Sequence, residues 1–144
     1  MRILIADDDP VYRALLGDLL GQWGFDVVLT CDGQEASEAI QADPDIDLAV
    51  LDWMMPGKDG YDLCREIKQN PARQDLYIII ITGSRCRDQL LKVVVAGADD
   101  YILKPFEPLD LKIRLHAAKR IIDLRAELAQ LRRSAEQRTG AGAH

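Results

Sequence analysis

The segment ILIADDDP, residues 3–10, joins a short apolar run to three aspartates and a proline. Four apolar residues that end at turn-forming residues are typical of a strand buried on both faces, as in a parallel sheet. Asp9 followed by Pro10 favours a helix start, because Asp caps free backbone N–H groups and Pro suits the first turn. The segment therefore predicts a strand, a short acidic turn and a helix.

Three later apolar runs end in the same way, at a residue that can handle a phosphoryl group: residues 48–51 at Asp52, residues 77–81 at Thr82, and residues 101–103 at Lys104. Residues 25–30 form a further β-rich run, and helical patterns follow the strands. Five βα units in this order predict an α/β fold with a doubly wound, five-stranded parallel sheet and helices on both faces. The last helix is expected to start near Pro108 and to be longer than the sheet requires.

One edge of the sheet is expected to gather five side chains, because ligands of open α/β sheets bind at the carboxyl ends of the strands: Asp7, Asp8, Asp52, Thr82 and Lys104. Two carboxylates about 4 Å apart repel by roughly 4 kcal/mol at an effective dielectric near 20. Three of them need a cation or a shared proton, and Mg²⁺ suits an oxygen site that phosphate completes. The lysine and the threonine can hold phosphoryl oxygens, and Asp52 can act as the nucleophile that forms an acyl phosphate.

Each of these motifs also has a structural explanation when it is taken alone. The acidic turn can be a helix cap with solvated neighbours, and Asp52 can open a turn. Thr82-Gly83 is a common strand exit, and Lys104-Pro105 alone carries almost no information. These separate accounts would have to place all four motifs at the same point of a repeating βα pattern. The combined pattern therefore favours a site that handles phosphoryl groups.

The composition argues against several other classes of protein. A net charge of −6 and a pI near 4.9 do not suit a broad nucleic-acid surface, which would need a basic stripe. Cys31, Cys64 and Cys86 are odd in number and lack metal-ligand spacing, as is typical of reduced cysteines in the cytoplasm. The sequence shows neither a signal peptide nor an apolar stretch near the ~20 residues of a membrane span. We expect a cytoplasmic protein without direct contact to nucleic acid or membrane.

In combination, the motifs resemble those of response-regulator receiver domains of bacterial two-component signalling, over about residues 1–120. The similarity is carried by four segments: residues 5–9, 51–60, 81–83 and 97–106. It implies a CheY-like, flavodoxin-like sheet with strand order 2-1-3-4-5. It also implies that a sensor histidine kinase or a phosphotransfer protein donates a phosphoryl group from phosphohistidine to Asp52. Such a domain is a signalling phosphoacceptor that promotes only its own phosphorylation and dephosphorylation, and it is not an enzyme for other substrates.

The resemblance also implies a set of Mg²⁺ ligands: the carboxylates of Asp8 and Asp52, the Met54 backbone carbonyl, and Asp7 through water. Thr82 and Tyr101 would form a switch pair, in which the hydroxyl turns toward the phosphoryl group and the ring moves inward. A cis peptide bond between Lys104 and Pro105 is expected to aim the lysine at the acids, since this form costs only ~0.5–1 kcal/mol before proline. The phosphorylated domain would then act on a downstream protein or an output domain.

The segment Leu90-Leu91-Lys92-Val93-Val94-Val95 departs from many DNA-binding members of the family, which carry charges on this helix for a salt-bridged dimer. Some of Leu90, Val93 and Val94 are expected to face outward and to form an apolar contact surface. One or two exposed aliphatic side chains without a role are an equally good explanation.

No proline or glycine interrupts the chain between Pro108 and about Ala135, which predicts a helix of ~42 Å. Beyond the domain, the apolar residues follow the 3-4-3 spacing of a coiled coil: Ile121, Leu124, Leu128 and Leu131. We expect a receiver over residues 1–120, a helical extension over residues 121–136 able to pair in a homodimer, and a disordered tail over residues 137–144. The alternative is an amphipathic end helix that folds back on its own domain.

Two further functional readings remain open from the sequence. The chain can be the receiver of a longer regulator with a diguanylate cyclase or another output domain. It can also be a Mg²⁺-dependent aspartyl phosphatase of similar fold, although those enzymes favour a second Asp two residues after the nucleophile, where this chain has Met54. A degenerate receiver that serves only as a scaffold would lack an acid, the threonine or the lysine, and none of these is missing from the sequence.

Overall fold

Residues 1–83 and 86–142 are described by the computed structural model, which shows an α/β fold. The strands are β1 (Arg2–Ala6), β2 (Asp26–Thr30), β3 (Ile46–Asp52), β4 (Tyr77–Thr82) and β5 (Asp100–Leu103). The helices are α1 (Pro10–Gln22), α2 (Gly33–Ala42), α3 (Gly60–Gln69), α4 (Arg87–Val95) and α5 (Pro108–Gly142). Strands and helices alternate along the chain, as the sequence predicted.

The sheet has the strand order β2-β1-β3-β4-β5 with every neighbouring pair parallel, which confirms the predicted flavodoxin-like topology. Asp7 and Asp52 each lie one residue beyond Ala6 and Leu51, the last residues paired between β1 and β3. Lys104 lies one step beyond the rung that pairs Thr82 with Leu103. The register therefore brings the predicted site residues to one edge of the sheet.

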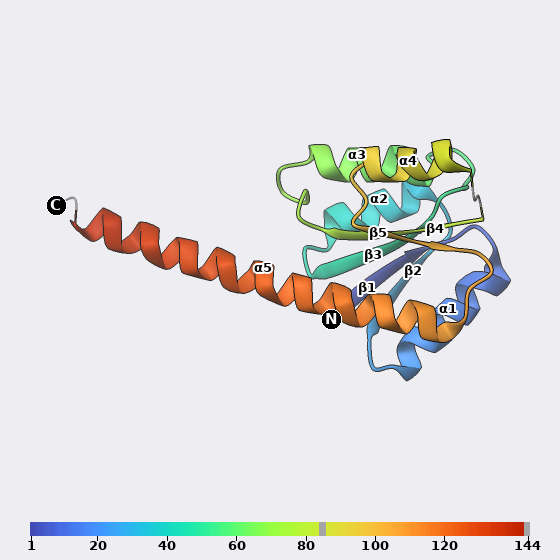
Figure 1. Ribbon diagram of the computed structural model, residues 1–144, viewed down its shortest axis with the longest axis horizontal. Helices are drawn as coiled ribbons and strands as arrows, with labels where there is room; N and C mark the ends of the chain where they lie inside the picture. The colour runs from blue at the N-terminus through green and yellow to red at the C-terminus, as the bar shows by residue number, and fades with distance from the viewer. Residues whose placement is uncertain (84–85, 143–144) are drawn as a thin grey trace.

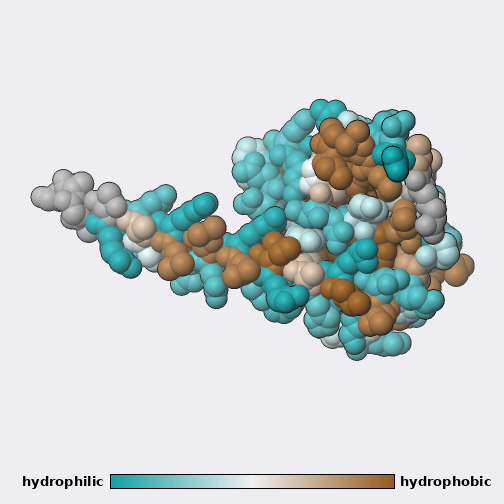
Figure 2. Space-filling model, viewed as in Figure 1, coloured by the Kyte–Doolittle hydropathy of each residue, from teal (hydrophilic) through white to brown (hydrophobic). Residues whose placement is uncertain are grey.

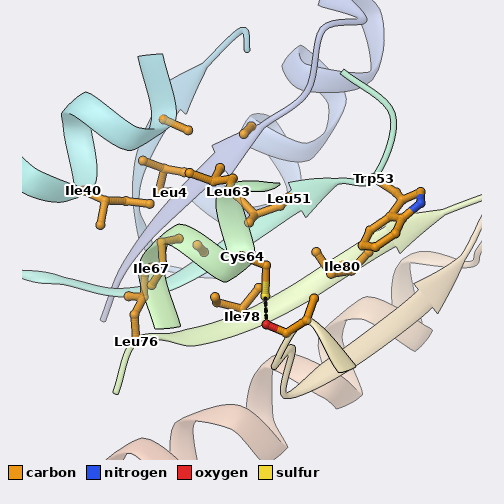
Figure 3. Packing of buried hydrophobic residues seen from close by; sticks show 14 of the residues in the cluster. Leu4, Ile40, Leu51, Trp53, Leu63, Cys64, Ile67, Leu76, Ile78 and Ile80 are labelled. Atoms are coloured by element: carbon orange, nitrogen blue, oxygen red, sulfur yellow. Dashed lines mark hydrogen bonds between the residues drawn. The ribbon is translucent and has the colours of Figure 1, made fainter. Parts of the chain in front are cut away.

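Helices α1 and α5 cover one face of the sheet, and α2, α3 and α4 cover the other (Figure 1). Each face has its own core, because the strands are buried on both sides. The core under α1 and α5 includes Ile3, Leu16 and Leu115. In the opposite core, shown in Figure 3, the Cys64 thiol donates to the Ala96 carbonyl oxygen at 3.4 Å. Burial raises the pKa of this thiol to about 11, so it stays protonated and acts as a structural residue.

The outward face of α4 is apolar, and Figure 2 shows a hydrophobic patch over this helix. Leu91, Val94 and Val95 expose 61%, 62% and 69% of their surface. Of Leu90, Val93 and Val94, some of which were expected to face outward, Val94 is exposed, Leu90 is half-buried and Val93 is 2% exposed. The helical period explains this pattern, because residues three or four apart share a face: Leu90, Val93 and Ala96 lie on the inward side, and Leu91, Val94 and Val95 on the outward side.

Helix α5 is longer than predicted, since it continues to Gly142 rather than ending near Ala135. It therefore includes residues 137–142 of the segment predicted to be disordered, while residues 143–144 lie outside the described part of the chain. The helix extends well beyond the sheet at the edge opposite the loop that precedes it (Figure 1). No helix among the described residues has an apolar stretch long enough to cross a membrane.

Candidate functional site

Three carboxylates meet at the ends of β1 and β3. One oxygen from each of Asp7, Asp8 and Asp52 lies within 4.8 Å of the other two. Asp7 and Asp52 are buried, with 1% and 9% of their surface exposed, whereas Asp8 is exposed. The structure thus brings together the three acids that the sequence placed at this edge.

The acid cluster fits a hard divalent cation. Asp7 Oδ1 accepts a hydrogen bond from the Asp9 N–H at 2.9 Å, but the buried Oδ2 accepts none from the residues that the structure describes. An unsatisfied buried acceptor costs about 1–3 kcal/mol, and more when it is charged. A cation held by these oxygens would remove that cost, and Mg²⁺ prefers such carboxylate ligands together with water and phosphate.

The charge of Asp52 is disfavoured by the protein groups around it. Burial raises the pKa of this carboxyl to about 6, against an ordinary value of 3.8, and the negative charges of Asp7 and Asp8 act in the same direction. The Lys104 ammonium and the hydrogen bond from the Met54 N–H, at 3.3 Å from Oδ1, oppose the rise in pKa. The Asp52 side chain is therefore a carboxylate at neutral pH, but Lys104 and the Met54 N–H offset only part of the cost of its charge.

Lys104 reaches the acids from the loop between β5 and α5. Its Nζ lies 3.6 Å from Oδ2 of Asp7 and 3.6 Å from Oδ2 of Asp52. Its backbone N–H donates to the Thr82 carbonyl oxygen at 2.8 Å, which ties the loop to the end of β4. The Lys104–Pro105 peptide bond is cis, as the sequence analysis predicted.

Thr82 and Tyr101 lie on neighbouring strands near the acids. Thr82 is buried at the carboxyl end of β4, with 3% of its surface exposed. Tyr101 in β5 is half-buried and packs against the core under α2, α3 and α4. The positions suit a switch pair, and the switch itself stays a prediction, as does metal binding by the Met54 carbonyl.

Gly60 allows α3 to start directly against the strand that carries Asp52. A Cβ at this position would lie 2.8 Å from the Asp52 carbonyl oxygen and 2.9 Å from the Trp53 Cα. The Gly60 N–H donates to the Trp53 carbonyl oxygen at 3.1 Å. The glycine at the end of the Asp52 motif is therefore required for close backbone packing at the site.

The sequence analysis did not identify Tyr12 as a site residue. Its ring lies beside Lys104, with Nζ 4.2 Å from the ring centroid. An aromatic residue in the first turn of an amphipathic helix is usually part of the core, so its type and spacing gave no signal. Only its place directly after the acidic turn pointed to this edge of the sheet.

A second group with metal-ligand spacing contains Cys31, Asp32 and Glu35, at the end of β2 and the start of α2. The Cys31 thiol donates to Glu35 Oε2 at 2.9 Å, and this hydrogen bond raises the pKa of the thiol. Asp32 caps α2 by accepting from the Glu35 N–H at 2.7 Å. These contacts give the three side chains structural roles.

The sequence model of the response regulator receiver domain matches residues 3–116. The chain therefore belongs to the response regulator receiver domain family. It is 38% identical over 117 residues to the transcriptional regulatory protein AruR of Pseudomonas aeruginosa, with 78% of this chain and 47% of that protein covered. It is 36% identical over 118 residues to the phosphate regulon transcriptional regulatory protein PhoB of the same bacterium, with coverage of 82% and 51%. The chain thus spans about half the length of the curated relatives it matches.

Solved structures agree with this assignment. A putative response regulator from Chloroflexus aurantiacus superposes with a TM-score of 0.77 at 33% identity, covering 81% of this chain and 95% of that one. The receiver domain of sensor histidine kinase PA1611 from Pseudomonas aeruginosa, which has a magnesium ion in its active site cleft, gives 0.76 at 28% identity, covering 85% and 97%. A probable two-component response regulator/GGDEF domain protein gives 0.80 at 28% identity, covering 85% and 50%.

The chain is accordingly a receiver domain of two-component signalling, as the resemblance implied. Receiver domains bind Mg²⁺ in an acidic pocket, and they interact with sensor kinases and output domains. The comparisons do not favour the aspartyl phosphatase, and they do not single out a cyclase among the output domains.

Proposed function

We propose that Asp52 accepts a phosphoryl group from the phosphohistidine of a sensor histidine kinase or a phosphotransfer protein. The convergence of three carboxylates with Lys104 at one edge of the sheet carries this proposal. A carboxylate oxygen of Asp52 bonds to phosphorus while the phosphorus–nitrogen bond to the donor imidazole breaks. The second ring nitrogen keeps its proton, so the products are an acyl phosphate and a neutral histidine.

The other residues around Asp52 have separate roles in the transfer. In this proposal Asp8, Asp52 and the Met54 carbonyl would hold Mg²⁺ directly, and Asp7 would hold it through water. When bound, the ion neutralises negative charge on the phosphoryl oxygens and the carboxylates. Lys104 moves from pairing with the two buried carboxylates to pairing with a phosphoryl oxygen, since its ammonium already lies 3.6 Å from Asp52.

The output of this site is a conformational switch that acts on another protein. The Thr82 hydroxyl turns toward the phosphoryl group, and Tyr101 follows it inward on the neighbouring strand. A downstream protein or an output domain then recognises the changed surface, in the cytoplasm, where the cysteines would remain reduced thiols. The chain makes no direct nucleic-acid contact in this scheme, consistent with its net charge of −6.

The extension of α5 is proposed to join two receivers. In this division residues 1–120 form the receiver, residues 121–136 form the pairing helix, and residues 137–144 follow as a tail. Four side chains form the proposed seam: Ile121, Leu124, Leu128 and Leu131, which expose 38%, 63%, 48% and 65% of their surface. Figure 2 shows apolar side chains along the part of α5 that extends beyond the domain.

Incubation with Mg²⁺ and acetyl phosphate tests the phosphoacceptor. We expect intact-mass spectrometry to show one added phosphoryl group in the wild-type protein and none after EDTA treatment. Asp52→Asn should abolish the added mass, because an amide cannot form the acyl phosphate. Asp62→Asn, at an exposed acid on α3, serves as the matched control and should be labelled like the wild type. Labelling that persists in Asp52→Asn would show that the nucleophile is a different residue.

A further inference from the structure

We propose that Tyr12 is a positioning residue for phosphoryl transfer, whose ring holds the Lys104 ammonium between Asp7 and Asp52. This inference rests on the proposed role of Asp52 as phosphoacceptor. Lys104 Nζ lies 4.2 Å from the Tyr12 ring centroid and 3.6 Å from each of the two carboxylate oxygens. A cation within ~6 Å of an aromatic centroid is attracted by the negative face of the ring. The ammonium is therefore contacted by groups from α1, from the turn after β1 and from the end of β3.

The ring has a fixed place because two separate elements hold it. Asp9 caps α1 by accepting hydrogen bonds from the N–H groups of Val11 and Tyr12, at 3.0 Å and 3.4 Å. The ring also packs edge-on against Phe106, with centroids 5.9 Å apart and planes at 79°. Phe106 belongs to the same loop as Lys104, so the lysine and its aromatic support are positioned together.

The lysine needs such support because the acids alone do not fix its direction. Its stem is long and flexible, and the side chain is 26% exposed. The two distances of 3.6 Å are longer than charge-assisted hydrogen bonds, which are about 2.7–2.9 Å. The ring limits the movement of the ammonium away from the acids, and therefore keeps it where a phosphoryl oxygen on Asp52 would arrive. Phosphoryl transfer depends mainly on positioning and charge neutralisation, so loss of this support should slow it.

The ring, rather than the phenol hydroxyl, carries the proposed role. Lys104 Nζ lies over the ring of Tyr12, 4.2 Å from its centroid, so the contact is made by the aromatic face. Tyr12→Phe keeps the aromatic face and should recover most of the rate, whereas Tyr12→Leu removes the face while keeping an apolar side chain.

The test is the saturating rate of phosphorylation of the full chain by acetyl phosphate with Mg²⁺, followed by intact mass. In this reaction an Asp52 oxygen bonds to phosphorus, the phosphorus–oxygen bond to acetate breaks, and acetate leaves. We expect Tyr12→Leu to lower the maximal rate about three- to thirtyfold, the range that a cation–π contact of this kind supports. The half-saturating concentration of donor should change little. Val11→Ala, at an exposed neighbour on α1, is the control and should match the wild type.

A double-mutant cycle separates positioning from a purely structural role. If Tyr12 acts through the lysine, Tyr12→Leu should have no further effect on the rate in a Lys104→Ala background. An equal loss of rate in the wild-type and Lys104→Ala backgrounds would show that Tyr12 supports the fold only. Phenylalanines with increasing fluorine content at position 12 give an isosteric series, in which the rate should fall as the ring face becomes less negative.

The outcomes also separate this inference from the proposed function. Wild-type protein that takes up no phosphoryl group contradicts the proposed function itself. Labelling that persists in Asp52→Asn contradicts it as well. Normal labelling of Asp52 with an unchanged rate in Tyr12→Leu and across the fluorinated series overturns only the role of Tyr12. A Tyr12→Phe rate as low as that of Tyr12→Leu would likewise rule out the ring.

Discussion

Asp52 is a buried carboxylate beside two others, and Lys104 offsets only part of the repulsion. The function of a receiver requires this arrangement, because the same crowding that disfavours the charge of Asp52 creates affinity for a divalent cation. The folded protein in its metal-free form should therefore be less stable than a neutral variant.

Asp52→Asn should raise the thermal stability of the metal-free protein at pH 8. The folded-state pKa of about 6 lies above the ordinary 3.8, so folding binds a proton at intermediate pH. The stability of the wild type should fall as pH rises from about 4 to 6, and the full cost is present above pH 6. The asparagine variant lacks this dependence and should gain roughly 1–3 kcal/mol at pH 8.

Calorimetric melting in EDTA, with and without excess Mg²⁺, measures this effect. Excess Mg²⁺ should stabilise the wild type more than Asp52→Asn and so narrow or reverse the difference. Asp62→Asn serves again as the control for removal of one negative charge at the surface. A metal-free asparagine variant that melts below the wild type at pH 8 would contradict the electrostatic account.

At the residue scale, the sequence predicted site residues wherever a polar or charged side chain comes at the end of a strand. Asp7, Asp52 and Lys104 were placed correctly because the end of a parallel strand fixes their position. Tyr12 was missed because its contact with Lys104 joins residues far apart in the chain, and neither residue type nor helical period specifies that contact.

At the scale of elements, the position of α3 depends on Gly60, which has no side chain. The start of this helix lies against the backbone of Asp52 and Trp53, and Gly60 is the residue that makes the approach sterically allowed. The helix also contributes Cys64 to the core under α2, α3 and α4. Displacement of α3 would therefore disturb both the core and the position of Asp52.

Gly60→Ala should destabilise the protein by about 1–3 kcal/mol, the usual cost of inserting a group into packed structure. The new Cβ would lie under 3.0 Å from two backbone atoms, so the helix itself has to move. The variant should also be phosphorylated more slowly, because the backbone of Asp52 and Trp53 would shift. Urea unfolding and the acetyl phosphate assay measure the two effects.

Gly21→Ala is the matched control for this prediction. Gly21 lies near the end of α1, and a Cβ there would meet no described atom within 4 Å. Alanine should therefore stabilise the helix by roughly 0.5–1 kcal/mol. Equal effects of the two substitutions on stability would show that the contact at Gly60 is not tight.

The predicted elements agree with the structure except at the end of α5. Apolar periodicity and turn residues located the strands and the first four helices, because burial on two faces leaves a clear pattern. The end of α5 carries no such pattern, since residues 137–142 have no sheet to cover, and glycine in the tail favoured disorder in the prediction.

At the scale of the whole molecule, α5 links the two ends of the domain. It starts next to the site, runs antiparallel to the strands, and leaves the domain at the opposite edge (Figure 1). Where it leaves, Arg125 Nη2 lies 3.2 Å from Asp99 Oδ1, and Nη1 donates to the Asp75 carbonyl oxygen at 3.5 Å. Asp99 also accepts from the Ile78 N–H at 2.8 Å. These contacts fix the direction in which the extension leaves the receiver.

The seam on this extension faces away from its own domain. Ile122 packs against the core under α1 and α5. At about 100° per residue, Leu124, Leu128 and Leu131 lie roughly 120–180° around the helix from Ile122, and Ile121 lies about 100° from it. This arrangement disfavours the folded-back alternative and leaves the seam free for a second helix. The sequence indicated the seam but not its orientation, which depends on the contacts of Arg125 and Ile122.

We predict a parallel dimer with Ile121 and Leu128 at a positions and Leu124 and Leu131 at d positions. Glu127 at g then faces Arg132 at e of the second copy, although an exposed pair contributes under ~1 kcal/mol. Arg120 and Arg125 at the preceding g and e positions would repel, but Arg125 is already paired with Asp99 of its own receiver. Burial of four apolar layers, at ~1.5–3 kcal/mol per aliphatic side chain, has to offset the entropy of association.

Sedimentation of the intact chain at tens of micromolar tests this dimer. Truncation after Lys119 and the double variant Leu124→Asp, Leu128→Asp should both give monomers, because each removes the apolar seam. The matched control, Ala126→Asp with Ala129→Asp, places the same charges on the other side of the helix and should remain dimeric. If the intact chain and all three variants sediment as monomers, the extension is an unpaired amphipathic helix. A dimer that persists in the double variant would instead place the interface elsewhere, and the apolar face of α4 would be the next surface to test.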